Sequence, residues 1–142
     1  MQETKRLVCL ANSQKYNGYC LAGKEIVSGG FGDWIRPVSA EEHGEIKQGE
    51  LIYEDGSPIT VCDTFIITLK GHSRHPYQSE NYLIDGGYYC KKTGKITWQD
   101  IKEIATYEKR DLWLNGFSSN NGENDRIPLS RLSYPEKSLR LT

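Results

Sequence analysis

Residue types that suit nucleic-acid binding lie two apart in the segment Gly32–Val38, which reads GDWIRPV. In an extended segment successive side chains alternate between faces, so Trp34 and Arg36 share one face. Tryptophan can stack on a base, and an arginine guanidinium can bind a phosphate or a base edge. The alternative interpretation places Trp34 in the core and pairs Arg36 with an acidic neighbour. The spacing predicts a stacking surface and leaves the structural role open.

A second group of polar side chains lies in His72–Asp85, which reads HSRHPYQSENYLID. A histidine such as His75 can act as a general base, and Glu80 can orient it. Gln78 and Asn81 can instead read base edges. A hydrogen-bonded loop that covers one end of the domain explains the same residues without any function. Because no nucleophile with a matched base is evident, no catalytic residue is assigned.

Basic residues are the third candidate group. The segment Asn12–Gly23 reads NSQKYNGYCLAG and places Lys15 in a glycine-bounded loop, where a lysine or backbone N–H groups can bind phosphate. The spacing is not that of a Walker A motif. The alternative is that Gly18 and Gly23 are turn and close-packing positions. The basic residues from Lys91 onward alternate with acidic ones, which favours a solvated surface.

Composition limits the classes of protein to which the chain can belong. It has 142 residues, which predicts one domain, with 37% hydrophobic and 26% charged residues and a net charge of −1. These values exclude a disordered chain and a protein that coats nucleic acid through phosphate contacts alone. No apolar run approaches the roughly 20 residues that a membrane span needs, so no membrane partner is expected. The N-terminus becomes polar too soon for a signal peptide, and the expected location is the cytoplasm.

The four cysteines fit a reducing compartment. They contain no C-x-x-C pair, and Cys9 and Cys62 lie inside apolar runs, where a free cysteine behaves as a small hydrophobic residue. The pattern predicts reduced thiols. It resembles none of the usual zinc spacings, so neither a metal nor another cofactor is expected.

The elements that must position these side chains are short strands separated by Gly, Asn, Asp and Pro. We expect strands over 5–11, 19–26, 33–38 and 59–70, a hairpin over 88–97 and an edge strand over 126–129. Loops are expected over 12–18, 71–87 and 115–125. A near capping box of Thr97 and Asp100 predicts one helix, which ends at about Lys109. This content favours a mainly β fold: a small barrel with one helix and long loops.

Four segments carry a resemblance to a known family: KRLVCLANSQK, GYCLAGKE, GDWIRPVS and YQSENYLID. Over about residues 5 to 130 they resemble the start of the dual OB-domain family. This is a bacterial family often discussed in the context of defence and mobile-element genes. The resemblance implies an OB-like barrel that binds nucleic acid or a nucleotide, and it brings neither an activity nor a cofactor. The positions that match the family's segments, without assigned roles, are Lys15, Lys24, Trp34, Arg36, His75, Gln78, Glu80 and Asn81.

The family pattern continues into a second barrel, whereas this chain stops at Thr142. We therefore expect residues 1–142 to form one OB-like domain, either a short member or the first half of a dual-barrel protein. The leading hypothesis is a binding module for single-stranded nucleic acid or a nucleotide. One alternative is an enzyme that acts on a nucleotide or nucleic acid through His75–Glu80. The other is a module whose protein partner pairs with an exposed strand.

Overall fold

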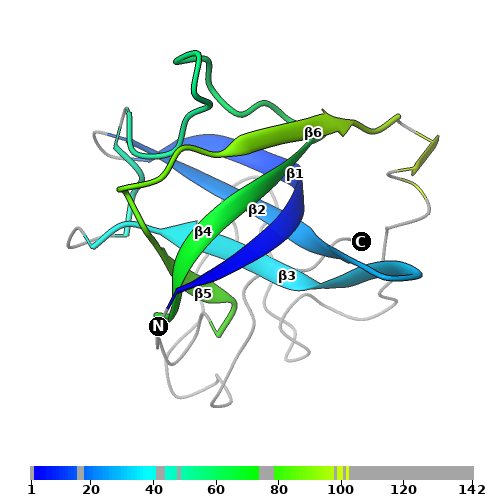
Figure 1. Ribbon diagram of the computed structural model, residues 1–142, viewed down its shortest axis with the longest axis horizontal. Helices are drawn as coiled ribbons and strands as arrows, with labels where there is room; N and C mark the ends of the chain where they lie inside the picture. Colours follow the sequence, from blue (N-terminus) through cyan, green and yellow to red (C-terminus); the bar gives the residue numbers. More distant parts are fainter. Residues whose placement is uncertain are drawn as a thin grey trace, which may run out of the picture.

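The computed structural model describes residues 2–15, 18–40, 44–47, 49–73, 79–97, 99–100 and 102. Within these ranges the chain forms six strands, which Figure 1 labels in chain order. Their bounds are β1 (Glu3–Lys15), β2 (Gly18–Val27), β3 (Gly30–Val38), β4 (Asp63–His72), β5 (Asn81–Ile84) and β6 (Lys91–Lys95). No helix of the described part is long and apolar enough to cross a membrane.

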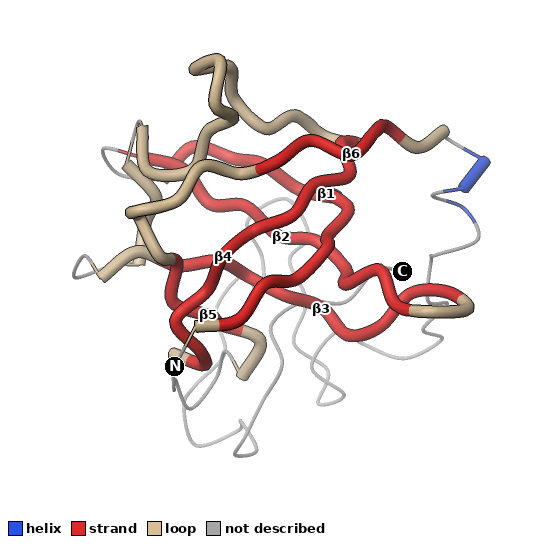
Figure 2. The backbone as a smooth tube through the Cα atoms, in the orientation of Figure 1, coloured by secondary structure: helices blue, strands red, loops and turns tan. Residues whose placement is uncertain are grey.

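Five of the strands close into a barrel. The order in the sheet is β1-β2-β3-β5-β4, and β4 pairs again with β1. The β3–β5 pair is parallel, and the other neighbours are antiparallel. Figure 2 shows these strands wound around one interior, and β6 pairs with the first residues of β4. The expected mainly β, OB-like barrel is confirmed.

The interior of the barrel is filled by apolar side chains from alternate positions of the strands. Three consecutive residues of β1, Leu7, Val8 and Cys9, are fully buried, so this part of the strand is covered on both faces. The connection between β3 and β4 also contributes four apolar side chains to the core. The side chains that form the core in the strands and in this connection are Leu7, Cys9, Leu21, Ile35, Phe65, Ile67, Leu69 and Ile84, and Ile46, Leu51, Tyr53 and Ile59.

Gly23 allows β1 and β2 to cross closely. It pairs with Cys9, and a Cβ atom at this position would overlap the backbone carbonyl of Val8. Gly18 is in the same situation against the carbonyl of Ile46. The close-packing role of these two glycines is therefore confirmed.

A group of polar side chains lies where β1, β2 and β5 approach one another. The Lys5 ammonium lies 3.2 Å from a Glu25 carboxylate oxygen, 3.5 Å from one of Glu3, and 5.5 Å from the centre of the Tyr82 ring. Its side chain is only 15% exposed. Burial lowers the pKa of Lys5, but the hydrogen bond and charge of Glu25, together with Glu3, outweigh this and raise the pKa overall. Lys5 is therefore a paired, half-buried cation.

Two strand boundaries differ from the sequence prediction near the start of the chain and at β4. The predicted loop over 12–18 is wrong up to Lys15, because Asn12–Lys15 continue the ladder of β1 opposite β2. Backbone pairing with β2 makes this segment part of the strand, although its side chains are polar. The predicted strand over 59–70 starts only at Asp63, whose amide donates to the Thr60 carbonyl (3.1 Å) in a turn that gives Cys62 a φ of 77°.

In the second half of the described chain, two predictions are wrong and one is confirmed. The predicted loop over 71–87 contains β5, and the predicted hairpin over 88–97 is the single strand β6, because β6 pairs with β4 and not with itself. The capping box is confirmed. The Thr97 amide and hydroxyl each donate to Asp100 Oδ2 at 2.9 Å, and residues 99–100 are helical. Lys102 is also helical. The other residues of the predicted helix and the elements expected over 115–129 lie outside the described residues.

All four cysteines are free thiols. Cys9 and Cys90 are buried, whereas Cys20 and Cys62 are partly exposed. Burial raises the pKa of Cys9 and of Cys90 to about 12. These two thiols are therefore protonated and unreactive at neutral pH.

Candidate nucleic-acid interface

The outer face of β2 and β3 brings a basic side chain and an aromatic one together. Ile35 points into the core and is 1% exposed, so its neighbours on β3 point away from the core. Lys24 and Trp34 are cross-strand partners, and the Lys24 ammonium lies 5.6 Å from the centre of the Trp34 ring, within cation–π range. Burial lowers the pKa of Lys24, and the charge of Asp33 opposes this shift. Both side chains are half-buried.

Arg36 lies two residues further along the same face and is held by Glu80. One guanidinium nitrogen of Arg36 lies 3.5 Å from a Glu80 carboxylate oxygen. The Arg36 amide also donates to the Glu80 carbonyl at 2.9 Å, next to the parallel pairing of Arg36 with Asn81. The Glu80 side chain is 1% exposed and that of Arg36 is 18% exposed. The buried carboxylate therefore fixes the guanidinium at the surface of the barrel.

The structure brings four of the predicted binding residues together and leaves the rest undescribed. Lys24, Trp34 and Arg36 share the outer face of β2 and β3, and Asn81 lies beside them at the start of β5, where it is 5% exposed. The expected pairing of Arg36 with an acidic neighbour is confirmed, whereas Trp34 is not a core residue. The side chain of Lys15, which ends β1, lies outside the described structure, and so do His75 and Gln78.

Phe31 belongs to the same face, although the sequence did not predict it. On β2, Lys24 and Ile26 lie two apart and point to one side, and their partners on β3 are Trp34 and Phe31. Two residues of β3, Gly32 and Asp33, therefore lie opposite one residue of β2, and this two-to-one pairing defines a β-bulge. The bulge aligns two aromatic residues that strict alternation would place on opposite faces. Phe31 is 40% exposed, and only the adjacent Gly32 and Asp33 signalled an irregular strand.

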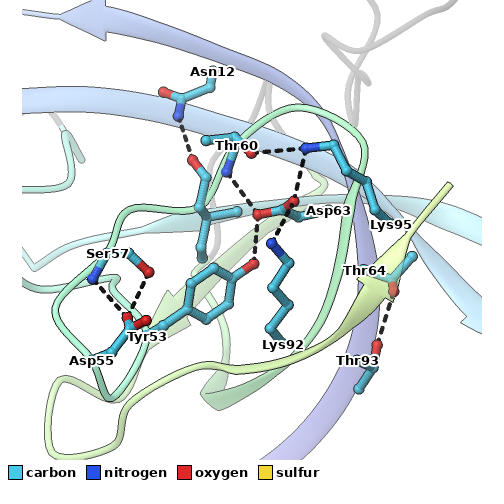
Figure 3. A network of polar contacts seen from close by, with 11 residues as sticks. Asn12, Tyr53, Asp55, Ser57, Thr60, Asp63, Thr64, Lys92, Thr93 and Lys95 are labelled. Carbon is cyan, nitrogen blue, oxygen red and sulfur yellow. Dashed lines mark hydrogen bonds and ion pairs between the residues drawn. The ribbon is translucent and has the colours of Figure 1, made fainter. Parts of the chain in front are cut away.

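A second polar cluster surrounds a buried carboxylate at the start of β4 (Figure 3). Its centre is the carboxylate of Asp63, which is 1% exposed. It accepts hydrogen bonds from the Tyr53 hydroxyl (2.8 Å), the Thr60 amide (3.0 Å) and the Lys95 ammonium (3.2 Å), and Lys92 lies 3.4 Å away. Burial by itself raises the pKa of Asp63, but these contacts outweigh it and lower the pKa to about 2. The cluster joins β4, β6 and the connection that contains Tyr53.

Comparison with protein families agrees with the barrel. The family model described as the dual OB-containing domain matches residues 5–142. The chain belongs to the dual OB-containing domain family. Comparison with curated proteins and with solved structures finds no match. Membership indicates, at the coarsest level, a module for binding nucleic acid or oligonucleotides, since OB folds bind such ligands on strands 2 and 3 and the adjoining loops.

In this OB domain the face that carries Lys24, Phe31, Trp34 and Arg36 lies on strands 2 and 3, which OB folds use to bind ligands. Lys24 is on β2, and Phe31 and Trp34 are on β3. Glu80 is the last residue of the connection between β4 and β5, and Asn81 is the first residue of β5. Within the described ranges, no three His, Cys, Asp or Glu side chains are placed to hold a metal ion. The Glu80 carboxylate contacts Arg36, and the catalytic alternative through His75 stays a prediction. The arrangement can stack planar groups and attract phosphates.

Proposed function

We propose that this OB domain binds single-stranded nucleic acid on the outer face of β2 and β3. The observation that carries the proposal is the alignment of Phe31, Trp34 and Arg36 along β3, with Lys24 packed on the Trp34 ring. Aromatic rings stack on bases of any sequence, and flanking cations attract the backbone phosphates. Family membership supports the same ligand class.

The charge of the chain sets the expected strength of binding. With 18 Lys and Arg residues against 19 Asp and Glu residues, the protein has no general attraction for a polyanion. Binding must therefore come from local contacts at Lys24, Trp34 and Arg36. We expect weak binding whose affinity decreases with salt. The slope of the logarithm of the binding constant against the logarithm of the salt concentration should be small, because few phosphates are contacted.

The test is fluorescence anisotropy with short labelled single-stranded DNA and RNA at two salt concentrations. Trp34→Ala should weaken binding about tenfold, because stacking contributes about 1–3 kcal/mol per base. Trp34→Phe, which keeps an aromatic face, should retain most of the affinity. Tyr88→Ala is the matched control, since Tyr88 is an aromatic residue outside this face with 53% exposure. Equal affinities of the parent and a folded Trp34→Ala variant would remove the proposal.

A further inference from the structure

The spacing of the two aromatic rings on β3 restricts how a strand can bind to the proposed face. Phe31 and Trp34 pair with two residues of β2 that lie two apart, Ile26 and Lys24. At about 3.4 Å per residue of an antiparallel strand, the two rings are anchored about 6.8 Å apart along the sheet. Neighbouring bases of a stacked strand are only about 3.4 Å apart. Two neighbouring bases therefore cannot reach both rings while they stay stacked on each other.

Each ring is a separate stacking surface. Phe31 is 40% exposed, and Trp34 is half-buried on the same face. In the described part of the chain, no ring contact joins Phe31 to Trp34. The two rings are therefore available to two different bases, one beside the other along β3.

Charge contributes little beside the rings, so stacking supplies a large share of the binding energy there. The chain has a net charge of −1. Burial lowers the pKa of Lys24, and the charge of Asp33 opposes this shift, so an acidic group acts on the ammonium that packs on Trp34. The attraction of this part of the face for a phosphate is therefore weak. The free energy needed to unstack the bases of a strand then decides how tightly that strand binds.

Strands differ in how strongly their neighbouring bases stack. Adenine bases stack strongly on each other, whereas thymine and cytosine bases stack weakly and leave the backbone flexible. A pyrimidine strand can therefore extend to reach both rings, but an adenine strand must first break its own stack or bind through one ring. We infer that the face holds an extended single strand, with one base on Phe31 and the next on Trp34, and that it selects pyrimidine-rich strands. This inference rests on the proposed function and names the class of strand that the same site prefers.

The test compares labelled oligo(dT), oligo(dC) and oligo(dA) of equal length by fluorescence anisotropy with the full chain. We expect both pyrimidine strands to bind about fivefold more tightly than oligo(dA), the lower end of the effect of one stacked base. In Phe31→Ala only one of the two rings remains, so the pyrimidine strands should bind about fivefold more weakly and oligo(dA) should change little. Phe31→Tyr, which keeps a ring, should retain the preference. Val27→Ala is the control, since Val27 is an exposed apolar residue of β2 that points to the opposite face from Ile26.

The results distinguish this inference from the proposed function. If Trp34→Ala weakens binding but all three strands bind the parent equally, the inference is overturned and the proposed function remains. The same holds if the preference persists in Phe31→Ala, or if oligo(dT) alone binds tightly, since that would show recognition of thymine edges. Thymidine monophosphate that loses affinity in both Phe31→Ala and Trp34→Ala would show one base held between the rings, which also overturns the inference. If no strand binds, or if a folded Trp34→Ala variant binds like the parent, both proposals fail.

Discussion

Replacement of the Asp63 carboxylate by an amide is the sharpest test of how the barrel is held together. In Asp63→Asn the side chain keeps its shape but loses its charge, so the Tyr53 hydroxyl and two ammonium groups lose an anionic acceptor. We expect the variant to fold, because the apolar core is unchanged. Its free energy of unfolding should be lower than that of the parent.

The magnitude follows from the pKa of Asp63. Its fall from 3.8 to about 2 means that folding favours the ionised form. At 1.36 kcal/mol per pKa unit, this corresponds to about 2.4 kcal/mol of stability at pH 7. A loss of hydrogen bonds to a buried charged group, at about 1.5–3 kcal/mol, gives a similar figure. Asp63→Asn should therefore lower the free energy of unfolding by about 2 kcal/mol at pH 7.

The same reasoning fixes the direction of the pH dependence. Because the pKa of Asp63 is depressed in the folded state, its contribution is complete above about pH 5 and is lost as the pH falls towards 2. The difference between parent and variant should decrease from about 2.4 kcal/mol at pH 7 to about 1.3 kcal/mol at pH 3. Protonation of the other carboxylates affects both proteins alike and cancels in the difference.

Urea unfolding followed by tryptophan fluorescence at pH 7, 5 and 3 measures this difference. Asp55→Asn is the control, since Asp55 is fully exposed and its bonds from Ser57 are local. It should change stability little at any of these pH values. A difference between parent and Asp63→Asn that stays constant from pH 7 to pH 3 would show that packing, and not the charge of Asp63, stabilises the cluster.

Three further predictions concern other parts of the barrel. Gly23→Ala should destabilise the fold by about 3 kcal/mol or prevent folding, because the new methyl group overlaps the β1 backbone, whereas Gly86→Ala, with nothing within 4 Å, should be neutral in the same urea assay. Cys9 and Cys90, whose pKa values are about 12, should react with a thiol reagent at pH 8 only as fast as the domain unfolds, and rapid labelling of the native protein would contradict their burial. Glu80→Gln should weaken oligonucleotide binding, because the Arg36 guanidinium loses the carboxylate that fixes it. A melting temperature near that of the parent confirms that the fold of this variant is intact. Unchanged binding would show that this ion pair does not position the site.

The candidate site could be predicted in part because its main residues are close in sequence. Trp34 and Arg36 lie two apart in an extended segment, and local alternation is sufficient to place them on one face. Phe31 was missed because alternation places it on the opposite face, and the β-bulge that realigns it exists only when β3 pairs with β2. The contact of the segment around Tyr53 with the start of β6 was missed for a related reason. Backbone pairing brings these two segments together, through the bridge between Tyr53 and Cys90 and the hydrogen bond from the Cys90 amide to the Ile52 carbonyl.

The class of the fold, the positions of most strands and the start of the helix can be predicted from the order of the amino acids. These features depend on short-range physics: β-branched and aromatic runs, apolar periodicity, and the side chains of Thr97 and Asp100 that satisfy local amides. The strand order, the partners of Asp63 and Glu80, and the strand conformation of polar segments such as Asn12–Lys15 and β6 depend on contacts between distant parts of the chain. Such segments carry no apolar pattern, and they become strands because a neighbouring strand offers backbone hydrogen bonds that the chain would otherwise leave unsatisfied.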